Sequence, residues 1–231
     1  MMLRLSHLKL DLQRDTIVQD FNLSLQYGEV KTLFGPSGCG KTTILRLISG
    51  LVKPSAGSIS CHFQKIGFLF QENRLLDNLN ALQNIAIFMP SPDLKKIYTT
   101  AATIGLNQSD LNKYPSQLSG GMAKRVAFLR MFLSGCDLAL LDEPFVGLDR
   151  DLRQVLINML INKIEHKQLS CLLVTHDRYE AAKLSHEILF LSKKGMLVEK
   201  KLCLETPLLE RNSKYEEDIV NQYFNGVIYY E

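Results

Sequence analysis

The sequence predicts an α/β fold, with an antiparallel β region near its start and a helical region inserted between two strands. Three observations predict it. Short, fully apolar runs at 138–141 and 171–174 are typical of parallel strands that are buried on both faces of a sheet. Amphipathic helical patterns separate such strands along the chain, as in α/β cores. The first 25 residues instead alternate apolar and polar side chains, which indicates antiparallel strands.

The elements up to residue 71 follow from periodicity and from glycines that end them. Gly35 ends an apolar strand, and Gly50 ends a helical pattern because glycine is the common residue after a helix. The expected elements are antiparallel strands within 3–25 with a turn at Arg14-Asp15, a strand at Val30–Phe34, a helix at 42–48, a turn at 54–57, and strands at 59–63 and 66–70.

A helical pattern then runs over 75–133, with breaks at 89–93 and 114–121. After it we expect strands at 138–141, 171–174, 188–191 and 196–200, and helices at 152–166, 180–184 and 216–224. We expect one domain, 1–231, with a core and β region (1–71 and 133–205), a helical subdomain (72–132) and a C-terminal helical extension (206–231).

The composition excludes several classes of protein. Of 231 residues, 46% are hydrophobic and 22% are charged, which is ordinary globular usage and argues against a disordered or collagen-like chain. Five widely spaced cysteines without a Cys-x-x-Cys pair indicate reduced thiols rather than disulfides or a zinc site. A net charge of +3 is too small to indicate nucleic-acid binding, so we expect no nucleic-acid partner.

No apolar run is long enough to span a membrane, and Arg4 and Lys9 interrupt any signal-peptide core. We therefore expect a cytoplasmic protein.

A glycine-rich loop carries the strongest chemical signal. Residues 35–42 fit the pattern G-x-x-x-x-G-K-[ST], between an expected strand and an expected helix. Glycines let successive backbone N–H groups converge on a phosphate, and the helix start adds the positive end of its dipole. Lys41 can bind the β- and γ-phosphates, and the Thr42 hydroxyl can bind Mg²⁺. The loop predicts a P-loop NTPase core that binds ATP and Mg²⁺ through Gly35, Pro36, Ser37, Gly38, Cys39, Gly40, Lys41 and Thr42.

A second glycine pair precedes the helical run at 122–132. Gly120 and Gly121 expose N–H groups to an anion, and Ser119 can cap the helix and donate to a phosphate oxygen. Such a loop is usually an ordinary capped helix, but beside a P-loop it predicts a second phosphate contact.

Acidic and histidine side chains follow two of the buried strands. Asp142 and Glu143 come at the end of the strand at 138–141, where sites in α/β folds form. Asp142 is placed to hold Mg²⁺, and Glu143 can act as general base toward a water. His176 follows the strand at 171–174, from which it can reach a γ-phosphate and position that water.

These motifs, in this order, resemble those of the ATP-binding cassette (ABC) ATPase family over about residues 2–205. The resemblance implies that the P-loop extends to Thr43, that Gln71 reaches the Mg²⁺ and the water, and that Asp149 contacts the nucleotide from a loop at 146–149. It also implies that Lys41, Gln71, Glu143 and His176 act in ATP hydrolysis, with Thr42, Gln71 and Asp142 at the metal.

The resemblance also implies partners. Two copies are expected to pack head to tail as a homodimer, with each ATP between the P-loop of one and the Ser119-Gly120-Gly121 loop of the other. The segment between Gln71 and Asn84 looks like that of nitrate-, sulfonate- and taurine-type importers, and its leucines exceed the needs of one helical face. We expect integral membrane permease subunits to dock there, a periplasmic or surface solute-binding protein to act indirectly, and the chain to lie on the inner face of the membrane.

The sequence departs from the family pattern at two places, and Cys39 carries a separate hypothesis. Met122 replaces the glutamine that normally ends the family's signature loop, which affects loop positioning and hydrolysis rate. No aromatic side chain is present at 10–14 to stack on adenine, so Leu12 is the candidate apolar platform. Cys39 lies at a helix start, which tends to lower a thiol pKa, so alkylation is expected to block ATP binding.

The expected function is ATP binding and hydrolysis in a membrane ABC transporter, an importer of a small solute. The alternatives are a soluble ABC ATPase such as an iron–sulfur-assembly type, a lipid-exporter ATPase subunit, and a cassette that binds ATP without hydrolysing it. Members with a long coiled coil are excluded, because Lys41 and Ser119 are only 78 positions apart.

Overall fold

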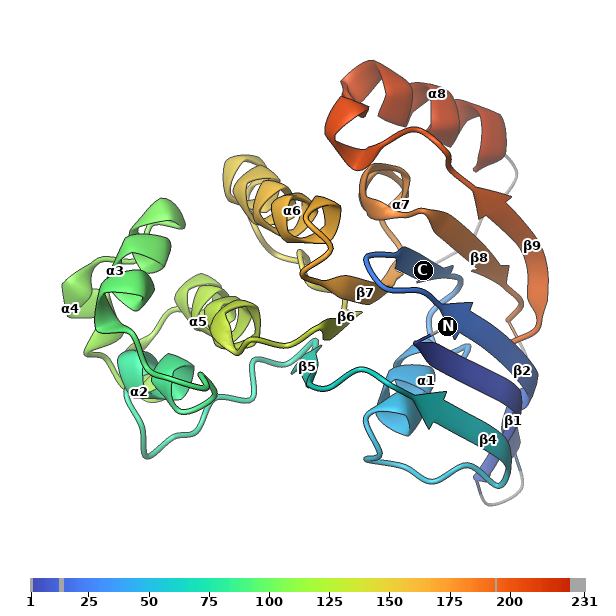
Figure 1. The fold of residues 1–231 in the computed structure, drawn as a ribbon, viewed down its shortest axis with the longest axis horizontal. Coiled ribbons are helices and arrows are strands. Elements are labelled where there is room, and N and C mark those ends of the chain that lie inside the picture. Colours follow the sequence, from blue (N-terminus) through green and yellow to red (C-terminus); the bar gives the residue numbers. More distant parts are fainter. Residues whose placement is uncertain (1, 13–14, 194, 225–231) are drawn as a thin grey trace.

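The computed structural model describes residues 2–12, 15–193 and 195–224. Its centre is a six-stranded sheet with the strand order β5-β6-β7-β3-β8-β9, in which only the pair β8 and β9 is antiparallel (Figure 1). The strands are β3 (Val30–Phe34), β5 (Ile66–Leu69), β6 (Leu138–Asp142), β7 (Ser170–Thr175), β8 (Glu187–Leu191) and β9 (Val198–Cys203). The predicted α/β fold is confirmed.

Strand register brings the predicted motifs to one edge of this sheet. Phe34 pairs with Thr175, and Asp142 pairs with Val174. The segments that follow β3, β6 and β7 therefore leave the sheet side by side at its carboxyl edge, where ligand sites of α/β sheets form.

The two faces of the sheet pack against different layers, because successive side chains of a strand point to opposite faces. Leu138 and Leu140 of β6 join a core with α1 (Lys41–Ile48) and the antiparallel sheet β2-β1-β4. Ala139 and Leu141 join the core of the helical insertion and α6 (Arg150–Glu165). The antiparallel strands are β1 (Leu3–Leu12), β2 (Asp15–Leu25) and β4 (Ala56–Cys61).

The helical insertion forms a separate lobe beside β5 and β6 (Figure 1). It consists of α2 (Ala81–Ala86), α3 (Leu94–Thr103), α4 (Gln108–Leu111), η1 (Pro115–Gln117) and α5 (Gly120–Leu133). The fully buried Asn84 side chain accepts from the backbone of Leu76 and donates to the carbonyls of Leu76, Leu79 and Asn80. Asn84 therefore fixes the turn before α2 from inside.

The C-terminal segment packs back on the core through α7 (Arg178–Leu184), η2 (Leu208–Glu210) and α8 (Ser213–Tyr223). Phe224, fully buried, meets Phe34 edge to face with ring centroids 4.9 Å apart, and Phe190 at 5.1 Å. Because Phe34 directly precedes the glycine-rich loop, the end of the described chain lies against the strand that carries this loop.

Some boundaries differ from those expected. β4 begins at Ala56, in the predicted turn, because Ala56 already pairs with Lys9 of the antiparallel strand β1. β9 begins at Val198, because Met196 adopts a left-handed turn conformation with φ of 53°. The segment before α2, predicted as helix, is a loop held by Asn84. The predicted turn residue Arg14 lies outside the described residues. Among the described residues, no helix has the length and apolar character that crossing a membrane requires.

Candidate functional site

The loop between β3 and α1 owes its path to glycines. Gly38 and Gly40 have φ of 76° and 109°, in the left-handed region that L side chains rarely adopt. A Cβ at Gly40 would also lie 3.3 Å from the backbone oxygen of Ile17. A side chain at position 40 would therefore strain the loop and press it against β2.

Lys41 and Thr42 begin α1 and connect this loop to β6. The Lys41 ammonium is buried and donates to the carbonyls of Gly35 (2.7 Å) and Pro36 (2.8 Å). The Thr42 hydroxyl donates to Oδ1 of Asp142 at 3.0 Å. Asp142 is only 2% exposed, and its burial raises the pKa of the carboxyl group. A divalent cation at these two oxygens would offset the cost of burying that charge, so the donor set fits Mg²⁺.

Glu143 and His176 meet at the carboxyl edge of the sheet. Nδ1 of His176 lies 2.9 Å from Oε1 of Glu143, and this hydrogen bond raises the pKa of the imidazole. Glu143 has a left-handed backbone with φ of 48°, held by its N–H to the carbonyl of Val174 at 2.9 Å. Its other oxygen, Oε2, is buried and has no hydrogen-bond partner within the described residues. That oxygen is free to accept a proton from a bound water.

A cavity of about 470 Å³ brings most of the predicted residues together. Its lining residues are Ile17, Ser37, Gly38, Gly40, Lys41, Thr42, Thr43, Gln71, Asp142, Glu143, Val146, Val174 and His176. The sequence reasoning did not find Ile17, because the period-two pattern of β2 does not show which end of the strand faces a site. It also did not place Val174 of the fully buried β7, or the Val146 side chain of the loop at 146–149, at the cavity. Leu12, the proposed adenine platform, has a side chain outside the described residues.

Lys124 is a further residue that sequence reasoning missed. Its ammonium reaches from α5 to the carbonyl of Glu143 (3.4 Å) and to that of Val146. Burial lowers the pKa of Lys124. The helix that follows Ser119 is thus tied to the backbone of Glu143.

Comparison with known proteins agrees with this geometry. The family model described as "ABC transporter" matches residues 18–146, which is more than half of the chain. The chain belongs to the ABC transporter family. It is accordingly an ATP-binding and ATP-hydrolysing transport subunit.

Relatives and solved structures support the same membership. An aliphatic sulfonates import ATP-binding protein, SsuB 2 of Pseudomonas syringae pv. tomato (strain ATCC BAA-871 / DC3000), is 40% identical, with 83% of this chain and 84% of that protein covered. The ergothioneine transport ATP-binding protein EgtV of Helicobacter pylori (strain G27) is 37% identical, over 75% of this chain and 89% of that protein. The dimeric ATP-binding cassette MJ0796, in a post-hydrolysis state bound to ADP and Pi, has a TM-score of 0.80 and 27% identity, and the match covers 89% of this chain and 100% of that one.

Within this ABC cassette, the predicted Ser119-Gly120-Gly121 loop and Asp149 do not line the P-loop cavity. Ser119 caps α5 by accepting from Met122 N–H at 3.2 Å, and Asp149 caps α6 by accepting from Leu152 N–H at 2.9 Å. A Cβ at Gly120 or Gly121 would meet no atom within 4 Å. Both loops thus present open backbone at helix starts, away from the cavity of their own subunit.

The expected lowering of the Cys39 pKa is wrong. Its thiol is 2% exposed and packs with the core of α1 and the antiparallel sheet, so burial raises its pKa instead of lowering it. The nearby Lys41 ammonium opposes this effect without cancelling it. Cys39 does lie next to the start of α1, but its side chain points into the core and not toward the phosphate-binding side of the loop.

We expect Cys39 to react with N-ethylmaleimide at least about tenfold more slowly than the exposed Cys203, because a buried thiol of raised pKa carries little thiolate. Peptide mapping by mass spectrometry after brief labelling of the folded chain gives both rates. Equal labelling of the two thiols would mean that Cys39 is accessible.

Proposed function

We propose that this cassette powers import of a small solute by ATP-driven head-to-tail dimerisation. The observation that carries the proposal is the single cavity in which Lys41, the Thr42–Asp142 pair and the Glu143–His176 pair converge. One relative is named for import of aliphatic sulfonates and another for transport of ergothioneine, which supports import of a small solute.

The residue roles follow from this geometry. Lys41 binds the β- and γ-phosphates together with the amides of the loop, which Gly35, Pro36, Ser37, Gly38, Cys39 and Gly40 form and which continues into Thr42 and Thr43. Thr42 and Asp142 would hold Mg²⁺, with Gln71 from the exposed segment after β5, and the ion would neutralise phosphate charge there.

In hydrolysis, Oε2 of Glu143 accepts the proton of the attacking water. His176 holds the other carboxylate oxygen, which fixes the direction of Oε2.

The site is completed by a second copy of the chain. Ser119, Gly120, Gly121 and Asp149 lie at helix starts outside their own cavity, so they are available to the nucleotide of a partner subunit. The dimeric form of a cassette with a TM-score of 0.80 supports this arrangement. Met122 keeps the cap of α5, because its N–H donates to the Ser119 hydroxyl at 3.2 Å, and its side chain packs partly buried against the core.

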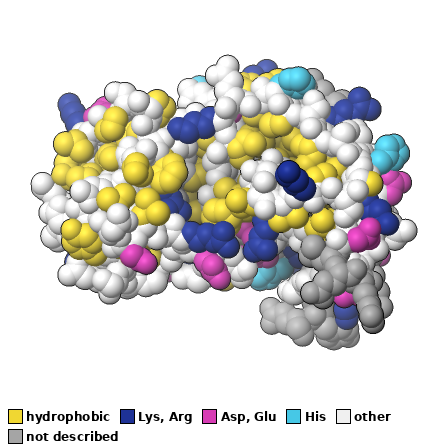
Figure 2. Space-filling view, turned by 90° about the horizontal axis from the view of Figure 1, so that it is seen from below, with side chains coloured by type: hydrophobic (Ala, Val, Ile, Leu, Met, Phe, Trp, Pro, Cys, Tyr) yellow, Lys and Arg dark blue, Asp and Glu magenta, His cyan; other side chains and the backbone are white. Residues whose placement is uncertain are grey.

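A groove between β5 and the insertion suits a short helix of a membrane permease. It has a volume of about 310 Å³ and is lined mainly by Phe68, Phe70, Arg74, Leu76, Phe88 and Arg130. Leu76 and Phe88 are exposed, whereas Leu75 and Leu82 pack against the insertion's own core. Figure 2 shows hydrophobic side chains on both the insertion and the core, on the face seen from below in Figure 1.

Phe70 lines the permease groove and the next residue, Gln71, lines the nucleotide cavity, so the groove adjoins that cavity. The Arg74 guanidinium lies 4.1 Å above the Phe70 ring, and Arg130 donates to the carbonyls of Asn73 (2.9 Å) and Arg74 (2.7 Å). These contacts make the segment after Gln71 a rigid wall of the groove. The chain would thus sit on the cytoplasmic face of the membrane, with a solute-binding protein on the other side.

The test of the proposed function is ATP hydrolysis by the purified chain with Mg²⁺, across a range of protein concentrations. Activity that rises more than linearly with concentration supports a shared site, because a dimer is then the active species. Activity proportional to concentration over the whole range would contradict it. No activity, with ATP bound, would favour a nucleotide-binding scaffold.

We expect Phe88→Asp to weaken co-sedimentation with membranes that contain the permease subunits by about tenfold, because it removes the exposed aromatic ring that lies 5.5 Å from the Arg130 guanidinium at the edge of the groove. Hydrolysis by the soluble chain should stay within about twofold. Leu209→Asp, at a 70% exposed position on η2, is the matched control. Unchanged sedimentation of Phe88→Asp would place the permease elsewhere.

A further inference from the structure

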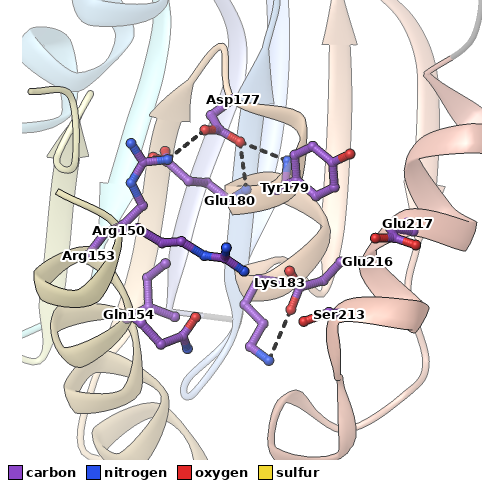
Figure 3. A pocket seen from close by; sticks show the side chains of 11 residues that line it. Arg150, Arg153, Gln154, Asp177, Tyr179, Glu180, Lys183, Ser213, Glu216 and Glu217 are labelled. Carbon is purple, nitrogen blue, oxygen red and sulfur yellow. Dashed lines mark hydrogen bonds and ion pairs between the residues drawn. The ribbon is translucent and has the colours of Figure 1, made fainter. Parts of the chain in front are cut away.

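His176 and Asp177 are neighbours in sequence but line two different cavities. His176 lines the P-loop cavity, whereas Asp177 lines a second cavity of about 470 Å³ between α6, α7 and α8. Figure 3 shows Asp177 at one end of this second cavity, with Arg153 reaching it from α6. The loop that carries the histidine is therefore held from the side opposite to the nucleotide.

Both oxygens of Asp177 are used in holding this loop. Oδ1 caps α7 by accepting from the N–H groups of Tyr179 (2.8 Å) and Glu180 (3.1 Å). Oδ2 accepts from Nη1 of Arg153 at 2.9 Å (Figure 3). One carboxylate thus joins the start of α7 to the side of α6.

The residue before His176 is fixed as firmly. The fully buried Thr175 hydroxyl donates to Oε2 of Glu180 at 2.6 Å and accepts from the N–H of Asp177 at 3.0 Å. Glu180 is 3% exposed, and burial raises its pKa to about 7. His176 therefore sits between two restrained neighbours, which limits the positions its imidazole can take.

Arg153 comes from the first turn of α6. Its N–H donates to the carbonyl of Asp149 at 3.0 Å, so it lies one turn after the predicted nucleotide contact of that loop. Its guanidinium lies 3.8 Å from Oε1 of Glu180 as well as bonding Asp177. Its Nε is buried and has no hydrogen-bond partner in the part of the chain that the structure describes. The contacts of the Arg153 guanidinium are thus with carboxylates at the start of α7.

We propose that Arg153 is a positioning residue for ATP hydrolysis, which holds the loop of His176 so that the imidazole keeps its contact with Glu143. The inference rests on the proposed roles of Glu143 and His176. Arg153 does not touch the nucleotide cavity, so it acts through Asp177. It also links the loop at Asp149 to the loop at His176 within one subunit.

The test compares Arg153→Met with the unmodified chain and with Gln154→Met. Gln154 lines the same second cavity from the same helix, but its amide bonds only to Asn158 among the described residues. We expect kcat of Arg153→Met to fall about 10- to 100-fold, the range for a catalytic group displaced by up to about 1 Å. The Kd for fluorescent ATP should change less than about twofold. Arg153→Lys should recover part of kcat, and Gln154→Met should be unaffected.

Asp177→Asn provides the second arm, because asparagine keeps the helix cap but loses the charge that Arg153 binds. If Arg153 acts through Asp177, the double variant Arg153→Met with Asp177→Asn is no slower than the slower single variant. The inference would be overturned if the kcat losses of the two single variants multiplied in the double variant, or if Arg153→Met had a normal kcat. It would also be overturned if Arg153→Met lost ATP affinity by the same factor as kcat. An inactive unmodified chain would instead count against the proposed function.

Discussion

Glu143→Gln should hydrolyse ATP about 100- to 10,000-fold more slowly than the unmodified chain, the range that a positioned general base contributes. Glutamine has the same shape and can keep a hydrogen bond to Nδ1 of His176, which is 2.9 Å from Oε1 in the structure. The amide has no basic oxygen to accept the water's proton, however, so only the chemical step is lost.

ATP affinity should change by less than about twofold in Glu143→Gln, because Lys41 and the loop amides, not Glu143, bind the phosphates. The variant should therefore accumulate as a dimer with Mg²⁺ and ATP, which size-exclusion chromatography detects. Glu199→Gln, an exposed glutamate on β9, is the control and should behave like the unmodified chain. Hydrolysis by Glu143→Gln within about tenfold of the unmodified rate would exclude Glu143 as the base.

Most residues of the nucleotide cavity could be predicted from the sequence because they lie in short local patterns. A glycine-rich loop, an acidic strand end and a histidine at a strand end are each recognisable within ten residues. Asp142 and His176 both follow buried strands, which predicts that they lie at the same edge of the sheet. The pairing of Asp142 with Val174 places them at that edge.

Features that depend on contacts distant in sequence could not be predicted. Ile17 lines the cavity because β2 passes beside Gly40, and a strand pattern alone does not show that approach. Cys39 was misjudged because its position at a helix start does not give the direction of its side chain. The bond between Arg153 and Asp177 joins two helices whose packing no local pattern specifies.

The sequence predicted a helix at 216–224 but not what holds the C-terminal segment on the core, and Arg211 explains how it is held. This arginine is 2% exposed, and its guanidinium donates to five carbonyls. Those of Ala182, Lys183 and Ser185 lie at or just past the end of α7, where carbonyls lack partners within the helix. Burial lowers the pKa of Arg211. The group is therefore a buried cation held by main-chain dipoles.

Arg211→Met should lower the free energy of unfolding by about 3–5 kcal/mol, because removing one side of a buried charged contact leaves several carbonyls unsatisfied. For a domain of this size the melting temperature should fall by roughly 10 °C. The free energy of unfolding of Arg211→Lys should lie between those of Arg211→Met and the unmodified chain, because one ammonium cannot reach all five carbonyls. Urea unfolding followed by circular dichroism measures these differences.

Lys214→Met, an exposed cation on α8, is the control and should change stability by less than about 0.5 kcal/mol. If Arg211→Met were as stable as Lys214→Met, the segment would be held by the packing of Phe224 against Phe34 instead.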